Sequence, residues 1–110
     1  MTPSDTIAAI SSSVGAAARM IVRLSGPAAF DLAMRAVPQL RAAASAQRHT
    51  MSMRGMHLPI WCYVFVAPHS YTGDDLVELH VPGNPLLARM VLDELLHLGA
   101  RPAEAGEFTA

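Results

Sequence analysis

The chain has no lysine, because all eight of its basic residues are arginine. This excludes any mechanism that needs a catalytic lysine, and it excludes the P-loop, whose lysine binds nucleotide phosphates. The single cysteine, Cys62, can form neither an internal disulfide nor a metal site with several thiolates. The longest apolar run, residues 60–67, is far too short to span a bilayer, and Asp5 precedes too short an apolar run for a signal peptide. We therefore expect a cytoplasmic domain.

Charge is scarce and balanced. Charged residues make up 15% of the chain, and eight basic residues against nine acidic ones give a net charge of −1. This balance provides no excess positive charge for a polyanion, so we expect no direct binding of nucleic acid by this chain alone. The 110 residues, of which 52% are hydrophobic, match the size and composition of one globular domain with its own core. We expect a single domain over residues 1–110.

Segments of strand character alternate with two segments of helical period. Apolar or β-branched runs bounded by turn residues predict strands at residues 6–10, 20–24, 60–66 and 76–81, a weaker one around 49–53 and a last short one near 101–103. The strand at 60–66 is apolar at both odd and even positions. We expect both of its faces to be covered, as in a central strand.

Two helices complete the predicted domain. The first is expected to begin at Pro27 and end near Val37, with Asp31 and Arg35 paired one turn apart on its solvent face. Its predicted apolar face comprises Phe30, Ala33, Met34 and Val37. For the second helix, Asn84 is the expected N-cap, Pro85 the first helical residue and Gly99 the end; its apolar stripe comprises Leu87, Val91, Leu95 and Leu98. The order of elements predicts an α+β domain with one mixed sheet and both helices on one face.

Two charged side chains interrupt the apolar strands: Arg23 in the second strand and Glu78 in the strand at 76–81. A charge in the middle of a strand is costly unless it is paired, hydrogen-bonded or in contact with water. One interpretation is structural, either a solvent-facing edge or an internal ion pair. The other is a ligand pocket, in which a carboxylate accepts two hydrogen bonds from an aminopyrimidine edge and an arginine binds a carboxylate or carbonyl. Alternation places His80 on the same face as Glu78.

No other constellation points to chemistry. The five histidines are scattered without metal-ligand spacing, and Cys62 lies in an expected core strand, so we expect no metal site. No nucleophile and base stand out as a pair, so we name no catalytic residue. Whether the chain belongs to an enzyme is left open by its residues alone.

Several blocks, in order, resemble the amino-terminal domain family of the tRNA modification GTPases called MnmE or TrmE. The most specific is PHSYTGDDLVELH at residues 68–80. The other blocks are DTIAAI at 5–10, IVRLSGP at 21–27, GAR at 99–101 and GEFT at 106–109. Together the blocks cover almost the whole chain.

The resemblance implies a folate-binding α+β domain that binds 5-formyltetrahydrofolate and forms a homodimer. In the full-length family proteins, a helical domain and an inserted GTPase domain follow, and a partner, MnmG, joins in modifying the wobble uridine of certain tRNAs. The family's folate-contacting arginine falls on Arg23 and its glutamate on Glu78. The resemblance thus implies a cofactor site at these two residues, a possible MnmG-like partner, and no direct tRNA binding by this domain alone.

The chain also departs from the family pattern. The family's PPG-type loop reads Ser13-Val14-Gly15 here, and its C-H-G-G turn reads VPGN at residues 81–84. A folate-contacting lysine in the family's next helix would lie beyond residue 110, as would the GTPase motifs and the carboxy-terminal cysteine motif, which Cys62 does not match. Two alternatives to a working folate module therefore remain. One is a non-catalytic dimerisation or interaction remnant with a decayed pocket, and the other is a gene fragment.

Overall fold

A computed structural model describes residues 5–12, 19–67, 73–104 and 107–108. Within these ranges the elements follow the predicted order. The strands are β1 (Ile7–Ser12), β2 (Arg19–Ser25), β3 (Ser45–Met53), β4 (Met56–Phe65), β5 (Leu76–Pro82) and β6 (Arg101–Pro102), and the helices are α1 (Ala29–Ala36) and α2 (Pro85–Leu98).

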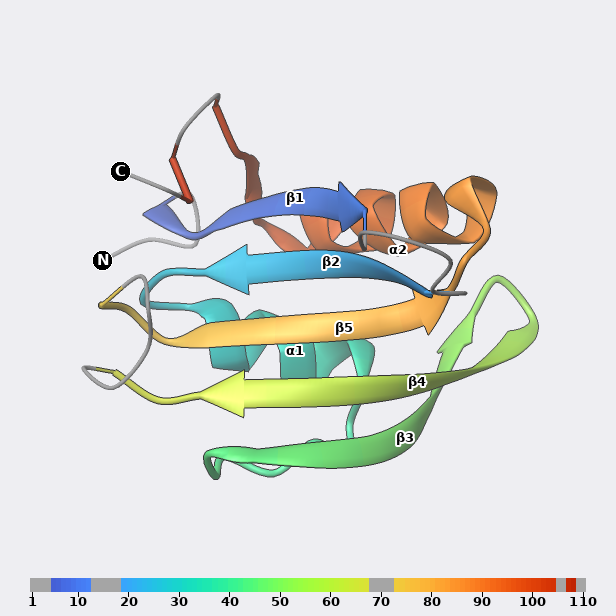
Figure 1. Ribbon diagram of the computed structural model, residues 1–110, viewed down its shortest axis with the longest axis horizontal. Helices are drawn as coiled ribbons and strands as arrows, with labels where there is room; N and C mark the ends of the chain where they lie inside the picture. The colour runs from blue at the N-terminus through green and yellow to red at the C-terminus, as the bar shows by residue number, and fades with distance from the viewer. Residues whose placement is uncertain (1–4, 13–18, 68–72, 105–106, 109–110) are drawn as a thin grey trace.

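The strands form one six-stranded sheet in the order β3-β4-β5-β2-β1-β6. Neighbouring strands are antiparallel except β1 and β6, which are parallel. Both helices lie behind the sheet in Figure 1, where α2 packs against β1, β2 and β5, and α1 packs against α2, β2 and β5. The predicted α+β fold, with a mixed sheet and both helices on one face, is confirmed.

The hydrophobic core lies between the sheet and the two helices. Strand positions that alternate toward the helices are fully buried, as Val22, Leu79 and Cys62 show, and they belong to one core cluster with Val91 and Leu95 of α2. Burial raises the pKa of the Cys62 thiol to about 12, because an apolar environment disfavours the thiolate. The predicted placement of Cys62 in a core strand is confirmed.

The prediction that both faces of the strand at 60–66 are covered is wrong. β4 does lie between β3 and β5, but the helices cover only its Ile60, Cys62 and Val64 side. Trp61 points to the other side and is 38% exposed. We call this side of the sheet, which carries Trp61, Tyr63, Phe65, Arg23, Glu78 and His80, the helix-free face. The aromatic residues of this strand predict a buried face because they are largely apolar. A partly exposed face of a sheet also accommodates such side chains.

The first helix begins later than the sequence predicted. Pro27 lies in the turn before α1, which starts at Ala29, and the backbone N–H of Ala28 donates to Oγ1 of Thr6 at 2.8 Å. The side chain of Thr6, which precedes β1, thus satisfies a backbone donor at the start of the helix, and no local sequence pattern predicts this contact.

The predicted apolar face of α1 and its charge pair are also partly wrong. Ala33 is buried as expected, but Met34 is 37% exposed, and Ala29, Leu32 and Ala36 supply the rest of the buried face. Across the part of the chain that is described, Asp31 and Arg35 form no ion pair, whereas Arg89 and Asp93 of α2 do, at 3.1 Å.

The limits of α2 match the prediction. Oδ1 of Asn84 accepts from the backbone N–H of Leu86 at 2.9 Å, Pro85 is the first helical residue, and Gly99 follows the last with a φ of +127°. These local signals are strong because each satisfies a backbone requirement of a helix end.

β3 and β4 form a long hairpin that the sequence showed only in part. The two-residue loop of Arg54 and Gly55 has positive φ at both positions, 51° and 78°, which is typical of a type I′ turn. A strand was expected only around residues 49–53, whereas β3 runs over Ser45–Met53. Arginine is uncommon at a positive φ, so the turn left a weak sequence signal.

Candidate functional site

Arg23 and Glu78, the two charges that interrupt apolar strands, lie opposite each other on β2 and β5. Nε of Arg23 donates to Oε2 of Glu78 at 2.9 Å, across 55 residues of sequence. Directly opposite residues of antiparallel strands have neighbouring side chains on one face, so the register itself creates this contact. The structure therefore brings together the two residues that sequence reasoning selected.

His80 extends the pair into a cluster of three side chains. Its Nε2 lies 3.1 Å from the second carboxylate oxygen of Glu78, Oε1. Its ring also contacts that of Tyr63, with the ring centroids 4.3 Å apart. Tyr63 lies opposite Glu78 on β4, so three adjacent strands contribute to one spot on the helix-free face.

The cluster is shielded from water only in part. The side chain of Glu78 is 11% exposed and that of Arg23 is 29% exposed. A carboxylate buried to this degree needs compensation, and Arg23 and His80 provide it through both oxygens. The same arrangement presents a carboxylate, a guanidinium and an imidazole side by side, and all three can hydrogen-bond a polar ligand.

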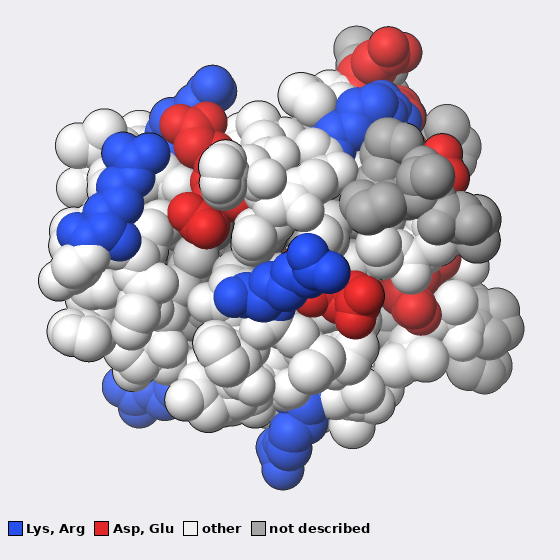
Figure 2. Space-filling model, turned by 180° about the vertical axis from the view of Figure 1, so that it is seen from behind, with Lys and Arg blue, Asp and Glu red and all other residues white. Residues whose placement is uncertain are grey.

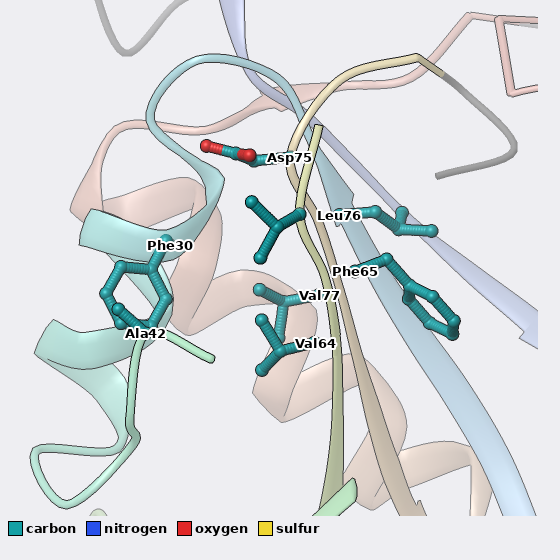
Figure 3. Close-up of a pocket in the computed structure, with 8 residues that line it drawn as sticks. Phe30, Ala42, Val64, Phe65, Asp75, Leu76 and Val77 are labelled. Carbon is teal, nitrogen blue, oxygen red and sulfur yellow. The ribbon is translucent and has the colours of Figure 1, made fainter. Parts of the chain in front are cut away.

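A separate, apolar pocket lies on the helical side of the sheet. It has a volume of about 90 Å³, and Figure 3 shows Phe30 and Ala42 on one side facing Val64 and Val77 from the strands. The carboxylate of Asp75 lies at one end and accepts from the backbone N–H of Ala67 at 3.0 Å. No member of the Arg23–Glu78 cluster lines this pocket.

The helical side shows no single-sign patch. In Figure 2, several basic side chains lie beside acidic ones, with broad uncharged areas between them. Within the described ranges, no group of three or more histidine, cysteine, aspartate or glutamate residues could hold a metal ion. No helix there is long and apolar enough to cross a membrane.

The profile of the family described as GTP-binding protein TrmE N-terminus matches residues 6–110. The chain belongs to this family. Curated relatives include the tRNA modification GTPases MnmE of Opitutus terrae, 39% identical over 107 residues, and of Wolinella succinogenes, 41% identical over 109 residues. A mitochondrial 5-taurinomethyluridine-tRNA synthase subunit of Mus musculus is 42% identical over 119 residues.

These alignments cover 96–99% of this chain but only 23–24% of the relatives. The chain thus spans about a quarter of the length of the curated relatives it matches. The comparison supports the TrmE amino-terminal fold and a context of tRNA modification, in agreement with the resemblance seen in the motifs.

Parts of three motif segments of this TrmE-family domain lie outside the described residues. They are residues 13–15, which replace the PPG-type loop, residues 68–72, at the start of the most specific motif, and residues 106 and 109 of the last motif. Of the most specific motif, residues 73–80 are described and carry Glu78 and His80. The sequence analysis named Glu78 as a site residue but not His80, although strand alternation placed both on one face. Tyr63 was missed because it was assigned to a covered face.

Proposed function

We propose that this TrmE-family domain binds a reduced folate, 5-formyltetrahydrofolate, and that Arg23 and Glu78 contact it. One observation carries the proposal: the two residues that match the family's folate-contacting positions form a partly exposed ion pair at 2.9 Å on the helix-free face. Charges inside apolar strands are expensive, and a ligand that uses them offers a reason for their presence.

The chemistry of the cluster suits the aminopyrimidine end of such a ligand. The 2-amino group and the adjacent ring N–H of a pterin form a parallel pair of donors, which matches the two oxygens of a carboxylate. Each oxygen of Glu78 can accept more than one hydrogen bond, so its contacts with Arg23 and His80 are compatible with ligand donors. Arg23 would orient the carboxylate and could donate to a ligand carbonyl.

The relatives, which are tRNA modification GTPases, support a context of tRNA modification, and the finer role rests on the family resemblance of the motifs. We infer that the domain is a homodimerising, folate-binding module of a system that modifies the wobble uridine of tRNA, with an MnmG-like partner. In this proposal the domain holds the cofactor and contributes no catalytic residue. A cytoplasmic location stays a prediction.

Isothermal titration calorimetry with 5-formyltetrahydrofolate tests the proposal. The unchanged chain should bind, and Glu78→Gln should weaken binding about tenfold or more, because a neutral amide presents one acceptor where the carboxylate presents two. Glu94→Gln, a change on α2, should leave binding as it is. No heat at millimolar ligand with the folded, unchanged chain would reject folate binding.

A second function, an interaction module with a decayed pocket, is favoured by one specific observation. Both oxygens of Glu78 already have partners within the chain, Arg23 and His80, so the cluster is also complete as a purely structural ion pair. This alternative predicts a dimer in analytical ultracentrifugation whose dissociation constant is the same with and without folate. Folate-dependent tightening of the dimer would contradict it.

A further inference from the structure

A groove opens on the helix-free face where β4 separates from β5. The two strands pair from Phe65 opposite Leu76 to Trp61 opposite His80, and the pairing ends at Trp61 and His80. Two residues beyond these, after Ile60 and Val81, come Pro59 on β4 and Pro82 on β5, and neither has a backbone N–H to continue the ladder. In Figure 1 the β3–β4 hairpin extends past the end of β5, at the right of the view. The two prolines thus mark the place where the sheet divides.

The groove has a volume of about 250 Å³ and combines positive charge with an aromatic ring. Arg19 of β2 and Arg48 of β3 line it together with Trp61, and none of the acidic residues that the structure describes does. The guanidinium of Arg48 lies over the Trp61 ring, 5.8 Å from its centroid. Among the described residues, no carboxylate lies within ion-pair distance of Arg48. A ring that stacks on Trp61 while carrying a negative charge toward the arginines would match all of these groups.

The groove is continuous with the Arg23–Glu78 cluster through His80. This residue lines the groove and also contacts Oε1 of Glu78 at 3.1 Å. Arg19 and Arg23 lie four residues apart on the same face of β2, which separates their Cα atoms by about 13 Å along the strand. One elongated molecule could therefore reach both ends of this surface.

We propose that the groove is the subsite for an aromatic ring bearing a carboxylate tail, on the ligand whose aminopyrimidine head meets Arg23 and Glu78. The inference rests on the proposed function for its head group. The folate of that proposal has such a tail, an aminobenzoyl ring joined to a glutamate with two carboxylates. Arg48 and Arg19 bind the carboxylates, and Trp61 stacks on the ring. Two arginines in a groove of this size suit a small dicarboxylate better than a nucleic acid, which requires a longer basic track.

The tail can be tested separately from the head, with N-(4-aminobenzoyl)-L-glutamate as the probe. Trp61 is the only tryptophan, so its indole N–H gives a single resonance in an NMR spectrum of the ¹⁵N-labelled chain. The probe should shift this resonance in a saturable way at millimolar concentration. Arg48→Gln should weaken the apparent affinity about fivefold or more, because it removes charge-assisted hydrogen bonds. The matched control is Arg35→Gln on α1, which should bind like the unchanged chain.

The outcomes separate the two proposals. Glu78→Gln should weaken binding of the complete folate about tenfold or more, while the probe shifts Trp61 at the same concentration as in the unchanged chain. A probe-induced shift that Arg48→Gln weakens supports the subsite even if the head proves not to bind a pterin. Absence of a shift, or an equal affinity in the folded Arg48→Gln variant, overturns the subsite. A single-stranded oligonucleotide that shifts Trp61 at lower concentration than the probe overturns it in favour of nucleic acid.

Discussion

Arg23 and Glu78 lie directly opposite each other on adjacent antiparallel strands, and Nε of Arg23 donates to Oε2 of Glu78 at 2.9 Å. An apolar strand environment disfavours either charge on its own. Their pairing explains how β2 and β5, which are otherwise mostly apolar, tolerate a charge in the middle of each strand. The pair is therefore both a structural element of the sheet and the feature on which the proposed folate site depends.

The first prediction concerns the stability of this pair. Arg23→Met should lower the free energy of unfolding by about 1–2 kcal/mol, because Glu78 is left largely buried with one partner fewer. The value lies below that for a fully buried pair, since the Arg23 side chain is 29% exposed. Urea unfolding followed by circular dichroism measures it. The double variant Arg23→Met with Glu78→Met should recover most of the loss, and failure to recover would argue against the pair as its cause.

Gly26 should be far more sensitive to substitution than Gly55. A Cβ added at Gly26 would lie 2.7 Å from the Cα of Thr6, and the backbone there has a φ of +140°. We expect Gly26→Ala to cost about 2–4 kcal/mol, because a disfavoured backbone and a clash with main-chain atoms add up. Gly55→Ala meets nothing within 4 Å, so it should cost about 1 kcal/mol from its positive φ alone. Equal losses in urea unfolding would contradict the packing described for the β2–α1 turn.

Cys62 should be unreactive in the folded chain. Its thiol is fully buried, and burial raises its pKa to about 12, so the reactive thiolate is scarce at pH 8. Ellman's reagent should react slowly with the native chain and at once in guanidinium chloride. Fast labelling under native conditions would show that β4 is more accessible than the structure indicates.

Glu107 should titrate well below its ordinary range. Nη1 and Nη2 of Arg101 donate to its two oxygens at 2.8 and 2.7 Å, and the backbone N–H of Glu104 also donates to it, which lowers its pKa to about 2. Because the folded pKa is lowered, this contact stabilises the turn after β6 above about pH 4.5 and is lost as the pH falls toward 2. Carboxyl ¹³C shifts measured against pH check the value. Arg101→Gln should return the midpoint to near 4, and an unchanged midpoint would rule out Arg101 as the cause.

The sequence predicted most of the fold because the residues that start and end its helices and strands act locally. Asn84, Pro85 and Gly99 each meet a requirement of one helix end, and α2 has the limits they indicate. The prediction errors arise where a contact with a residue far away in the sequence affects where an element begins. Just before the first helix, which starts at Ala29, the backbone N–H of Ala28 donates to Thr6, a residue that precedes β1 and is 22 positions away in the sequence. Such a contact leaves no pattern in the segment itself.

The candidate site was predictable to a similar degree. Arg23 and Glu78 were visible because each is a charge in an apolar strand, and alternation placed His80 beside Glu78. Tyr63 and Trp61 were assigned to a covered face, since periodicity shows that two faces differ but not which of them the helices cover. The groove by Trp61 depends on the register of β3, β4 and β5 and on where their pairing stops, and single-strand patterns contain no information on either.

The most direct test of the central claim, that Arg23 and Glu78 contact a folate, is to follow the Nε–H resonance of Arg23 by NMR during titration with 5-formyltetrahydrofolate. Loss of one peak in the folded Arg23→Met variant assigns the resonance. The account predicts a saturable shift of that resonance in the unchanged chain, and in Glu78→Gln a shift that needs about tenfold or more ligand. A resonance that stays in place while the ligand binds elsewhere, or that does not move at millimolar folate, would contradict the account.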